Sequence, residues 1–200
     1  NKGTPLQTTR AEHAARRVAE KIEQTLIGTI AGPAFGTAAN YGTAPKVYGY
    51  RNHPHRLTKT DLTASASATG ETILADVNAM ITTAVNANFY GPYILYVSNA
   101  YDRLLDNDFK AASDKTTRQR VGEIDQVKEV RRLDYLTGDE MILVQMDPEV
   151  CEAVNGMDPQ TIQWESHGGM RSNFKVIAIQ VPWVKTFVGD VTGVVHGTTS

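Results

Sequence analysis

The sequence is poor in cysteine and carries no excess of charge of either sign. Cys151 is the only cysteine among 200 residues, which excludes an internal disulfide and a zinc site built from several cysteines. Lysine and arginine number 20 against 22 aspartate and glutamate residues, for a net charge of −2. Dedicated nucleic-acid-binding domains usually carry a basic excess, so the composition disfavours that class.

Long apolar runs and catalytic motifs are also lacking. The apolar runs are short, as at residues 176–179, whereas a membrane-spanning helix needs about 20 apolar residues. We find no phosphate-binding loop, dinucleotide-binding glycine pattern, serine nucleophile elbow or H-E-x-x-H pair. The chain begins Asn1-Lys2-Gly3, without an initiator methionine or a signal-peptide pattern. We therefore expect a processed product or a fragment, with neither enzymatic activity nor a cofactor.

Two helices stand out by their apolar periodicity. Residues 9–27 carry an alanine-rich stripe, Thr9 and Glu12 have the spacing of a capping box, and Gly28 is suited to end the helix. We expect the alanine face to pack closely against a sheet formed by the C-terminal part of the chain. A second helix is predicted after Thr69 or Gly70, with apolar residues recurring at helical intervals through residue 85. Short helices are predicted at residues 99–105 and 117–124.

The other elements are short and rich in β-forming residues. Residues 93–97 and 141–146 are apolar on both faces, which is typical of central strands in a covered sheet. Strands are also predicted at residues 47–51, 127–133, 161–165 and 173–183, with a possible continuation at 187–195. His167-Gly168-Gly169 is predicted to form a hairpin turn, and residues 147–154 a short helical turn. Residues 30–45 are predicted to be irregular and residues 58–69 a loop or an edge segment. The fold class is α+β, with mixed or antiparallel sheets.

A few side chains could support chemistry, and each has a simpler explanation. His53 and His55 flank Pro54 and could ligate a metal, but further ligands are missing, so we expect solvated imidazoles in a turn. His167 and His196 are expected at the surface. Cys151 lies between Glu149 and Glu152, which would raise the pKa of its thiol, so we expect a buried structural cysteine. The aromatic side chains that we expect in the core or at an interface are Tyr93, Trp164, Trp183 and Phe187.

The order of these elements resembles the major capsid protein of phage Hong Kong 97 and the related encapsulins. Residues 91–97 read Gly-Pro-Tyr-Ile-Leu-Tyr-Val, which resembles the G-P-Y-x-L-x-V strand of encapsulins. The elements that follow are resembled by residues 101–105, 120–124 and 141–146 and by the stretch from 163 through 187. The resemblance implies a long spine helix and a peripheral domain at residues 1–68, an axial domain at 69–158, and return strands of the peripheral domain at 159–200. The N-terminal arm and extended loop that precede the spine helix in that family are not matched.

The polar segment at residues 106–117 is the main candidate for a site. It lacks periodicity and follows a predicted short helix, so we expect an exposed loop. The resemblance implies that such a loop lines the five-fold or six-fold axis of a shell, where neighbouring subunits meet. The residues expected at this subunit interface are Asp106, Asn107, Asp108, Lys110, Asp114 and Lys115.

The resemblance implies a structural protein rather than an enzyme. We expect a homo-oligomer of pentamers and hexamers that closes into an icosahedral phage head and encloses DNA without reading its sequence. It would assemble in the host bacterial cytoplasm, become part of the virion, and need no metal, cofactor or membrane. An encapsulin shell is the alternative within this class. A small metal-dependent enzyme using His53 and His55 is the alternative of another class, and particle size in solution separates the two.

Overall fold

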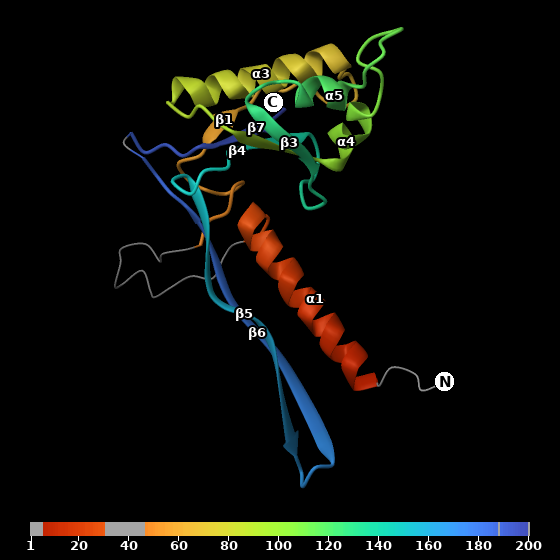
Figure 1. Ribbon diagram of the computed structural model, residues 1–200, viewed down its shortest axis with the longest axis vertical. Coiled ribbons are helices and arrows are strands. Elements are labelled where there is room, and N and C mark those ends of the chain that lie inside the picture. The colour runs from red at the N-terminus through yellow and green to blue at the C-terminus, as the bar shows by residue number, and fades with distance from the viewer. Residues whose placement is uncertain (1–5, 31–46, 188, 200) are drawn as a thin grey trace.

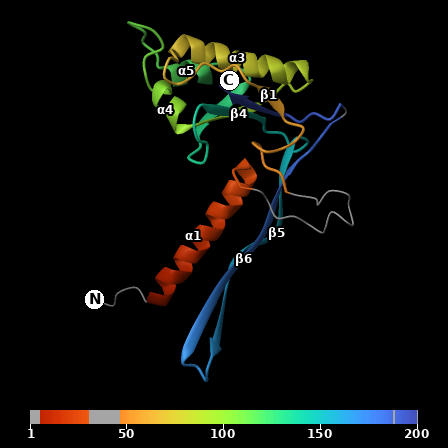
Figure 2. The same cartoon turned by 180° about the vertical axis from the view of Figure 1, so that it is seen from behind.

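The computed structural model describes residues 6–30, 47–187 and 189–199. A five-stranded sheet with helices on one face forms the first part, and a long helix beside a long hairpin forms the second (Figure 1). The view from behind shows the same helix and hairpin projecting from the sheet in the same direction (Figure 2). The expected irregular connection at residues 30–45 lies almost entirely outside the described residues.

The sheet is mixed, with the order β1-β7-β4-β2-β3. Its strands are β1 (Leu57–Lys59), β2 (Tyr93–Val97), β3 (Val127–Arg132), β4 (Glu140–Gln145) and β7 (Val194–Thr198). β1–β7 and β2–β3 are parallel pairs, whereas β2–β4 and β4–β7 are antiparallel. The predicted central strands at 93–97 and 141–146 are confirmed, and the segment at 58–69 contributes the edge strand β1.

The central strands are apolar on both faces because both faces are covered. Met141 and Leu143 of β4 point into a core with helix α3 (Gly70–Asn86), helix α5 (Thr117–Gly122) and Tyr93. The alternate residues Ile142 and Val144 pack in a second core with the end of helix α1 (Leu6–Ile27). Because successive side chains of β4 point to opposite faces of the sheet, this strand contributes to both cores and so joins the two parts of the molecule.

Helix α3 begins where its sequence predicts. The Thr69 hydroxyl accepts a hydrogen bond from the Thr72 N–H, and the Thr72 hydroxyl accepts one from the Thr69 N–H, which completes a capping box. The short helix α4 (Asn99–Leu105) and α5 also lie within their predicted ranges. The strand predicted at residues 47–51 is wrong. Its backbone instead meets the end of α1, where the Tyr50 N–H donates to the Leu26 carbonyl.

Helix α1 begins at Leu6 rather than at Thr9 and ends before Gly28, whose φ of 87° suits a residue without a side chain. It packs mainly on the hairpin strand β6 (Arg171–Val184), as predicted. The buried stripe is narrower than expected, since Ala14 and Ala19 are exposed. Ala11, Ala15, Val18 and Ile22 are half-buried and follow one helical face.

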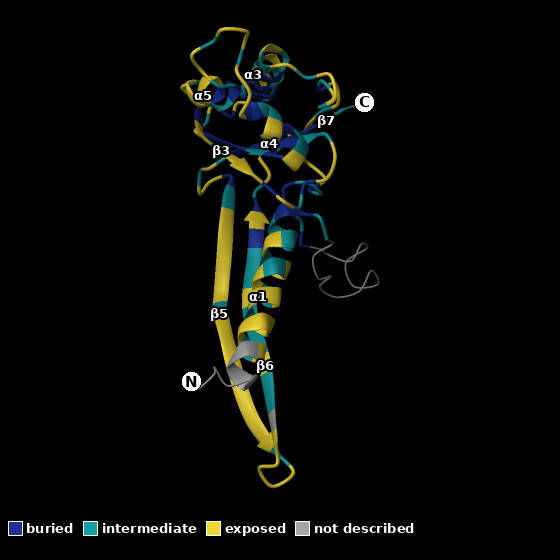
Figure 3. Cartoon of the chain, turned by 90° about the vertical axis from the view of Figure 1, so that its right-hand side faces the viewer, coloured by how far each residue is buried: buried dark blue, intermediate teal, exposed yellow. Residues whose placement is uncertain are grey.

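The hairpin is longer than the sequence pattern indicated. Strand β5 (Cys151–Ser166) pairs antiparallel with β6, and the turn at His167–Gly169 lies where it was predicted. The helical turn expected through Val154 is wrong from Cys151 onward, because that segment is already paired with β6. The expected domain boundary after residue 158 falls inside β5. Nearly the whole of β5 is exposed (Figure 3).

Candidate assembly surfaces

The loop at residues 106–117 is exposed at its tip but ordered at its base. An isolated antiparallel bridge joins Asp108 and Thr116, and the Phe109 N–H donates to the Lys115 carbonyl at 3.0 Å. The Thr117 N–H donates to the Asn107 carbonyl at 3.0 Å. The two ends of the loop are therefore held together before it projects from the sheet and its helices.

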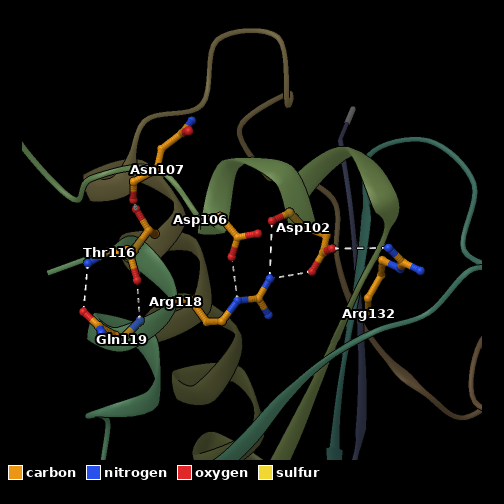
Figure 4. A network of polar contacts seen from close by, with 8 residues as sticks. Asp102, Asp106, Asn107, Thr116, Arg118, Gln119 and Arg132 are labelled. Carbon is orange, nitrogen blue, oxygen red and sulfur yellow. Dashed lines mark hydrogen bonds and ion pairs between the residues drawn. The ribbon is translucent and has the colours of Figure 1, made fainter.

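Arg118 fixes the base of the loop to helix α4 (Figure 4). Its guanidinium donates to Asp102 Oδ1 at 2.6 Å and to Asp106 Oδ1 at 2.9 Å. The pKa of Arg118 is raised chiefly by its hydrogen bond to Asp102. Arg132 from β3 lies 3.8 Å from the other oxygen of Asp102. The sequence pattern did not reveal this cluster, because its partners lie up to 30 residues apart and follow no motif.

The charged side chains of the loop are partly neutralised within the chain. Lys110 pairs with Glu71 at the start of α3, and Lys115 pairs with Glu123 at the end of α5. Asp106 is held by Arg118. The six predicted residues therefore all lie in the projecting loop. The carboxylates of Asp108 and Asp114 have no ion-pair partner among the described residues.

Two of the four histidines discussed above are buried, contrary to prediction. His53 is 6% exposed and His196 is 7% exposed, whereas His167 in the hairpin turn is exposed as expected. His53 lies beside His55, with ring centroids 5.9 Å apart. Within the described parts of the chain, no group of three or more residues is arranged to bind a metal ion. The imidazoles are buried by contacts between strands and loops that are distant in the sequence.

His196 lies between a guanidinium and a carboxylate. Arg56 Nε donates to His196 Nδ1 at 3.3 Å, and His196 Nε2 lies 3.5 Å from Glu140 Oε2. Arg51 binds the other oxygen of Glu140 at 2.6 Å. Burial lowers the pKa of both His196 and His53, although Glu140 partly opposes this for His196. This cluster ties the segment that follows α1 to strands β4 and β7.

The thiol and the aromatic side chains have different environments. Cys151 is half-buried, and burial, rather than its acidic neighbours in sequence, is the main cause of its raised pKa. Tyr93 belongs to the core. Trp164, Trp183 and Phe187 are exposed, so they do not lie in the core. Of the two positions predicted for them, only an interface remains.

The helices of the described residues are too short or too polar to cross a membrane. No significant match is found among curated protein sequences. Similar solved structures are shells. The chain matches the capsid of Myoviridae Phage XM1 with a TM-score of 0.74 and 10% identity, over 98% of this chain and 66% of that one. The mature capsid of bacteriophage PhiM1 matches with a TM-score of 0.57 and 11% identity, over 100% of this chain and 66% of that one.

A third similar structure is the virus-like particle from Pyrococcus furiosus. It matches with a TM-score of 0.57 and 18% identity, over 70% of this chain and 55% of that one. The chain thus spans from just over half to about two thirds of these shell proteins. A sequence-family model described as a family of unknown function matches residues 8–179. The chain therefore belongs to the family of unknown function DUF6260, and its fold is that of phage capsid proteins.

Proposed function

We propose that this chain is a shell subunit, the major capsid protein of a phage head of the Hong Kong 97 type. The likeness to the phage XM1 capsid over 98% of the chain is the observation that carries the proposal. The hairpin supports it on physical grounds. A two-stranded ribbon is marginally stable alone, yet β5 is exposed along nearly its whole length. Contacts with other subunits would supply the missing burial.

The two parts of the molecule correspond to the two domains of such a subunit. We assign residues 69–158 mainly to the axial domain, and residues 1–68 and 159–200 mainly to the peripheral domain. Strand β5 begins at Cys151 and pairs throughout with β6, so we move residues 151–158 to the peripheral domain. In this arrangement α1 is the spine helix, and the loop at 106–117 is the outermost part of the axial domain.

We place that loop at the five-fold and six-fold axes. The clamp of Arg118 on Asp102 and Asp106 would hold every copy of the loop in the same orientation. Rotation about an axis then repeats the free carboxylates of Asp108 and Asp114 around a ring. Lys110 and Lys115 are paired with Glu71 and Glu123 of their own chain. The carboxylates of neighbouring copies would therefore be balanced only by sharing Lys110 and Lys115. The repulsion between these carboxylates would act within the Debye length of about 8 Å.

The remaining features follow from a closed shell. Pentamers and hexamers of one chain would form the virion, assembled in the host bacterial cytoplasm, and would enclose DNA without reading its sequence. The net charge of −2 suits a container that does not condense its contents. An encapsulin compartment is the second candidate, favoured by the 18% identity to the Pyrococcus furiosus particle.

Cross-linking of the loop tests the axial position. Ala111→Cys in a Cys151→Ser background puts one thiol at the loop tip, and a short bismaleimide joins thiols only when copies lie close together. Because each chain then carries one thiol and the reagent joins two thiols, we expect a covalent dimer as the product in assembled rings. The matched control, Ala14→Cys on the exposed side of α1, should give little covalent dimer under the same conditions. Assembled particles whose loop thiols never cross-link would contradict the axial position of the loop.

A further inference from the structure

One face of the β5–β6 hairpin is an apolar stripe that the described chain approaches only at its Trp183 end, where Val47, Tyr48 and His53 lie beside it. Alternation along the paired strands separates two faces. Ala178 and Gln180 line a pocket together with Val18 and Ile22 of α1, and Val181 also reaches this pocket. The even-numbered Pro182 and Val184 are buried, whereas Ile179 and Trp183 are more than half exposed, so the even-numbered side of β6 faces the helix. The opposite face, which we call the outer face, carries Val154, Met157, Ile162, Trp164, Ile177, Ile179, Val181 and Trp183.

Several of these apolar side chains leave about half of their surface exposed. Trp164 is 47% exposed, Ile179 55% and Trp183 53%. Five of the eight side chains are between 45% and 55% exposed and the other three are half-buried. Since large side chains have about 150–250 Å² of surface each, the stripe presents roughly 600 Å² of apolar area. Contiguous apolar patches of this size usually mark an interaction site.

The free edge of β5 is poorly suited to pair with a further strand, so a partner would pack on the face of the hairpin. Pro159 lacks an N–H group to donate, and the β5–β6 register shifts between Asn155 and Met157 and again between Met157 and Gln160. These irregularities interrupt the hydrogen-bonding edge of β5, as in proteins that avoid strand addition. The outer face carries at least one apolar side chain in every cross-strand pair from Trp183 to Trp164, with Lys175 and Glu152 among its polar members.

We propose that a second copy of this chain covers the outer face, with the two hairpins packed face to face and antiparallel about a two-fold axis. The stripe is self-complementary in this orientation, because Trp164 near the tip of one copy meets the Trp183 end of the other. A pocket of about 460 Å³ at that end, lined in part by Val47, Tyr48 and Val154, is large enough to receive an indole ring.

Charge and area agree with this partner. The antiparallel orientation carries Lys175, which has no ion pair among the described residues, toward the end that bears Glu152 of the other copy. Glu152 already lies 3.0 Å from Lys185 of its own chain. Two stripes would bury roughly 1,200 Å², the lower end of the range for specific protein interfaces. The inference rests on the proposed function for the identity of the partner and adds the surface through which copies meet.

Tryptophan fluorescence tests it directly, because both tryptophans of the chain lie on the outer face. Sedimentation and acrylamide quenching are measured together over a dilution series of the whole chain. We expect quenching to fall about twofold over the concentrations at which copies associate, since half-exposed indoles become part of an interface core. Association that leaves both indoles accessible would overturn the inference. So would indoles that become shielded only when anionic lipid vesicles are added.

Two neighbouring substitutions provide a matched comparison. Ile162→Asp places a charge on the outer face, whereas Thr161→Asp places the same charge one residue earlier on the opposite face, where Thr161 is exposed. We expect Ile162→Asp to weaken association about tenfold or more and Thr161→Asp to leave it nearly unchanged. Thermal melts confirm that both variants fold. Equal effects would contradict the outer-face contact.

The outcomes also separate this inference from the proposed function. Closed particles with quenchable tryptophans would agree with the shell function and contradict the outer-face contact. Dimers with shielded tryptophans that never form closed particles would support the contact and contradict the shell function.

Discussion

At the residue scale, the order of the loop at 106–117 depends on one arginine. Arg118 joins Asp102 of α4 to Asp106 at the start of the loop. Polar composition correctly predicted an exposed loop, but it could not reveal the clamp. Ion pairs between residues that lie 12 and 16 positions apart leave no periodic signal, whereas capping motifs do.

Arg118→Ala should lower the free energy of unfolding by about 1–3 kcal/mol, because the mostly buried Asp102 carboxylate loses its charged hydrogen-bond partner. Urea unfolding monitored by circular dichroism measures the change. Arg103→Ala is the matched control, since Arg103 is exposed on the same short helix and has no ion pair among the described residues. Equal stability losses in the two variants would show that the clamp contributes nothing specific.

The buried histidines predict a dependence of stability on pH. Burial holds the pKa of His196 and His53 below the usual 6.5 in the folded chain. The unfolded chain therefore binds more protons as the pH falls below about 6.5. Stability from these groups is fully present above that pH and is lost as the pH falls toward the folded-state values.

His196→Gln should flatten this pH dependence, because glutamine keeps an acceptor for Arg56 and a donor toward Glu140 without titrating. Urea midpoints between pH 8 and pH 5 provide the measurement. The unsubstituted chain, measured over the same pH range, gives the reference slope. A steep slope that survives in His196→Gln would assign the acid sensitivity to other groups.

At the element scale, the sequence predicted helices better than it predicted the hairpin. Helix α3 carries its own capping box and an apolar stripe, so local signals define it. Strand β5 contains Asp158-Pro159 and Gly156, which normally indicate turns, and its pairing with β6 depends on residues up to 33 positions away. The burial of His53 and His196 was missed for the same reason, because His53 lies beside Val184 of β6 and His196 lies between Arg56 and Glu140.

The cap of α3 is open to a direct test. Thr69→Ala removes the hydroxyl that accepts the Thr72 N–H and should cost about 1 kcal/mol of stability. Thr82→Ala, at an exposed position inside the same helix, should be neutral or slightly stabilising because alanine is the better helix former. Thermal unfolding compares the two variants. A Thr69→Ala protein as stable as Thr82→Ala would contradict the role of the cap.

Helix α1 permits a similar comparison of its two sides. Ala15 is half-buried in the stripe with Val18 and Ile22, whereas Ala19 is exposed. Ala15→Trp should lower stability by about 1–3 kcal/mol through overpacking, and Ala19→Trp should change it by less than about 0.5 kcal/mol. Denaturant midpoints measure both. The reverse order would mean that α1 meets the hairpin through its other side.

At the scale of the whole molecule, the hydrophobic core accounts for the sheet and its helices but not for the hairpin. The cores around β4 are closed on both faces, whereas the outer face of the hairpin remains exposed. The order of helices and strands was enough to indicate a capsid-type fold from the sequence. The surfaces that join copies could not be predicted in the same way, because their burial belongs to the assembly.

The most direct test of the proposed function is electron microscopy of the purified, concentrated chain. The proposal predicts closed particles of uniform size, built from rings of five and six copies with the loop at 106–117 nearest each ring axis. A chain that stays monomeric at every concentration examined, with the outer face of its hairpin still exposed, would contradict a shell-building function.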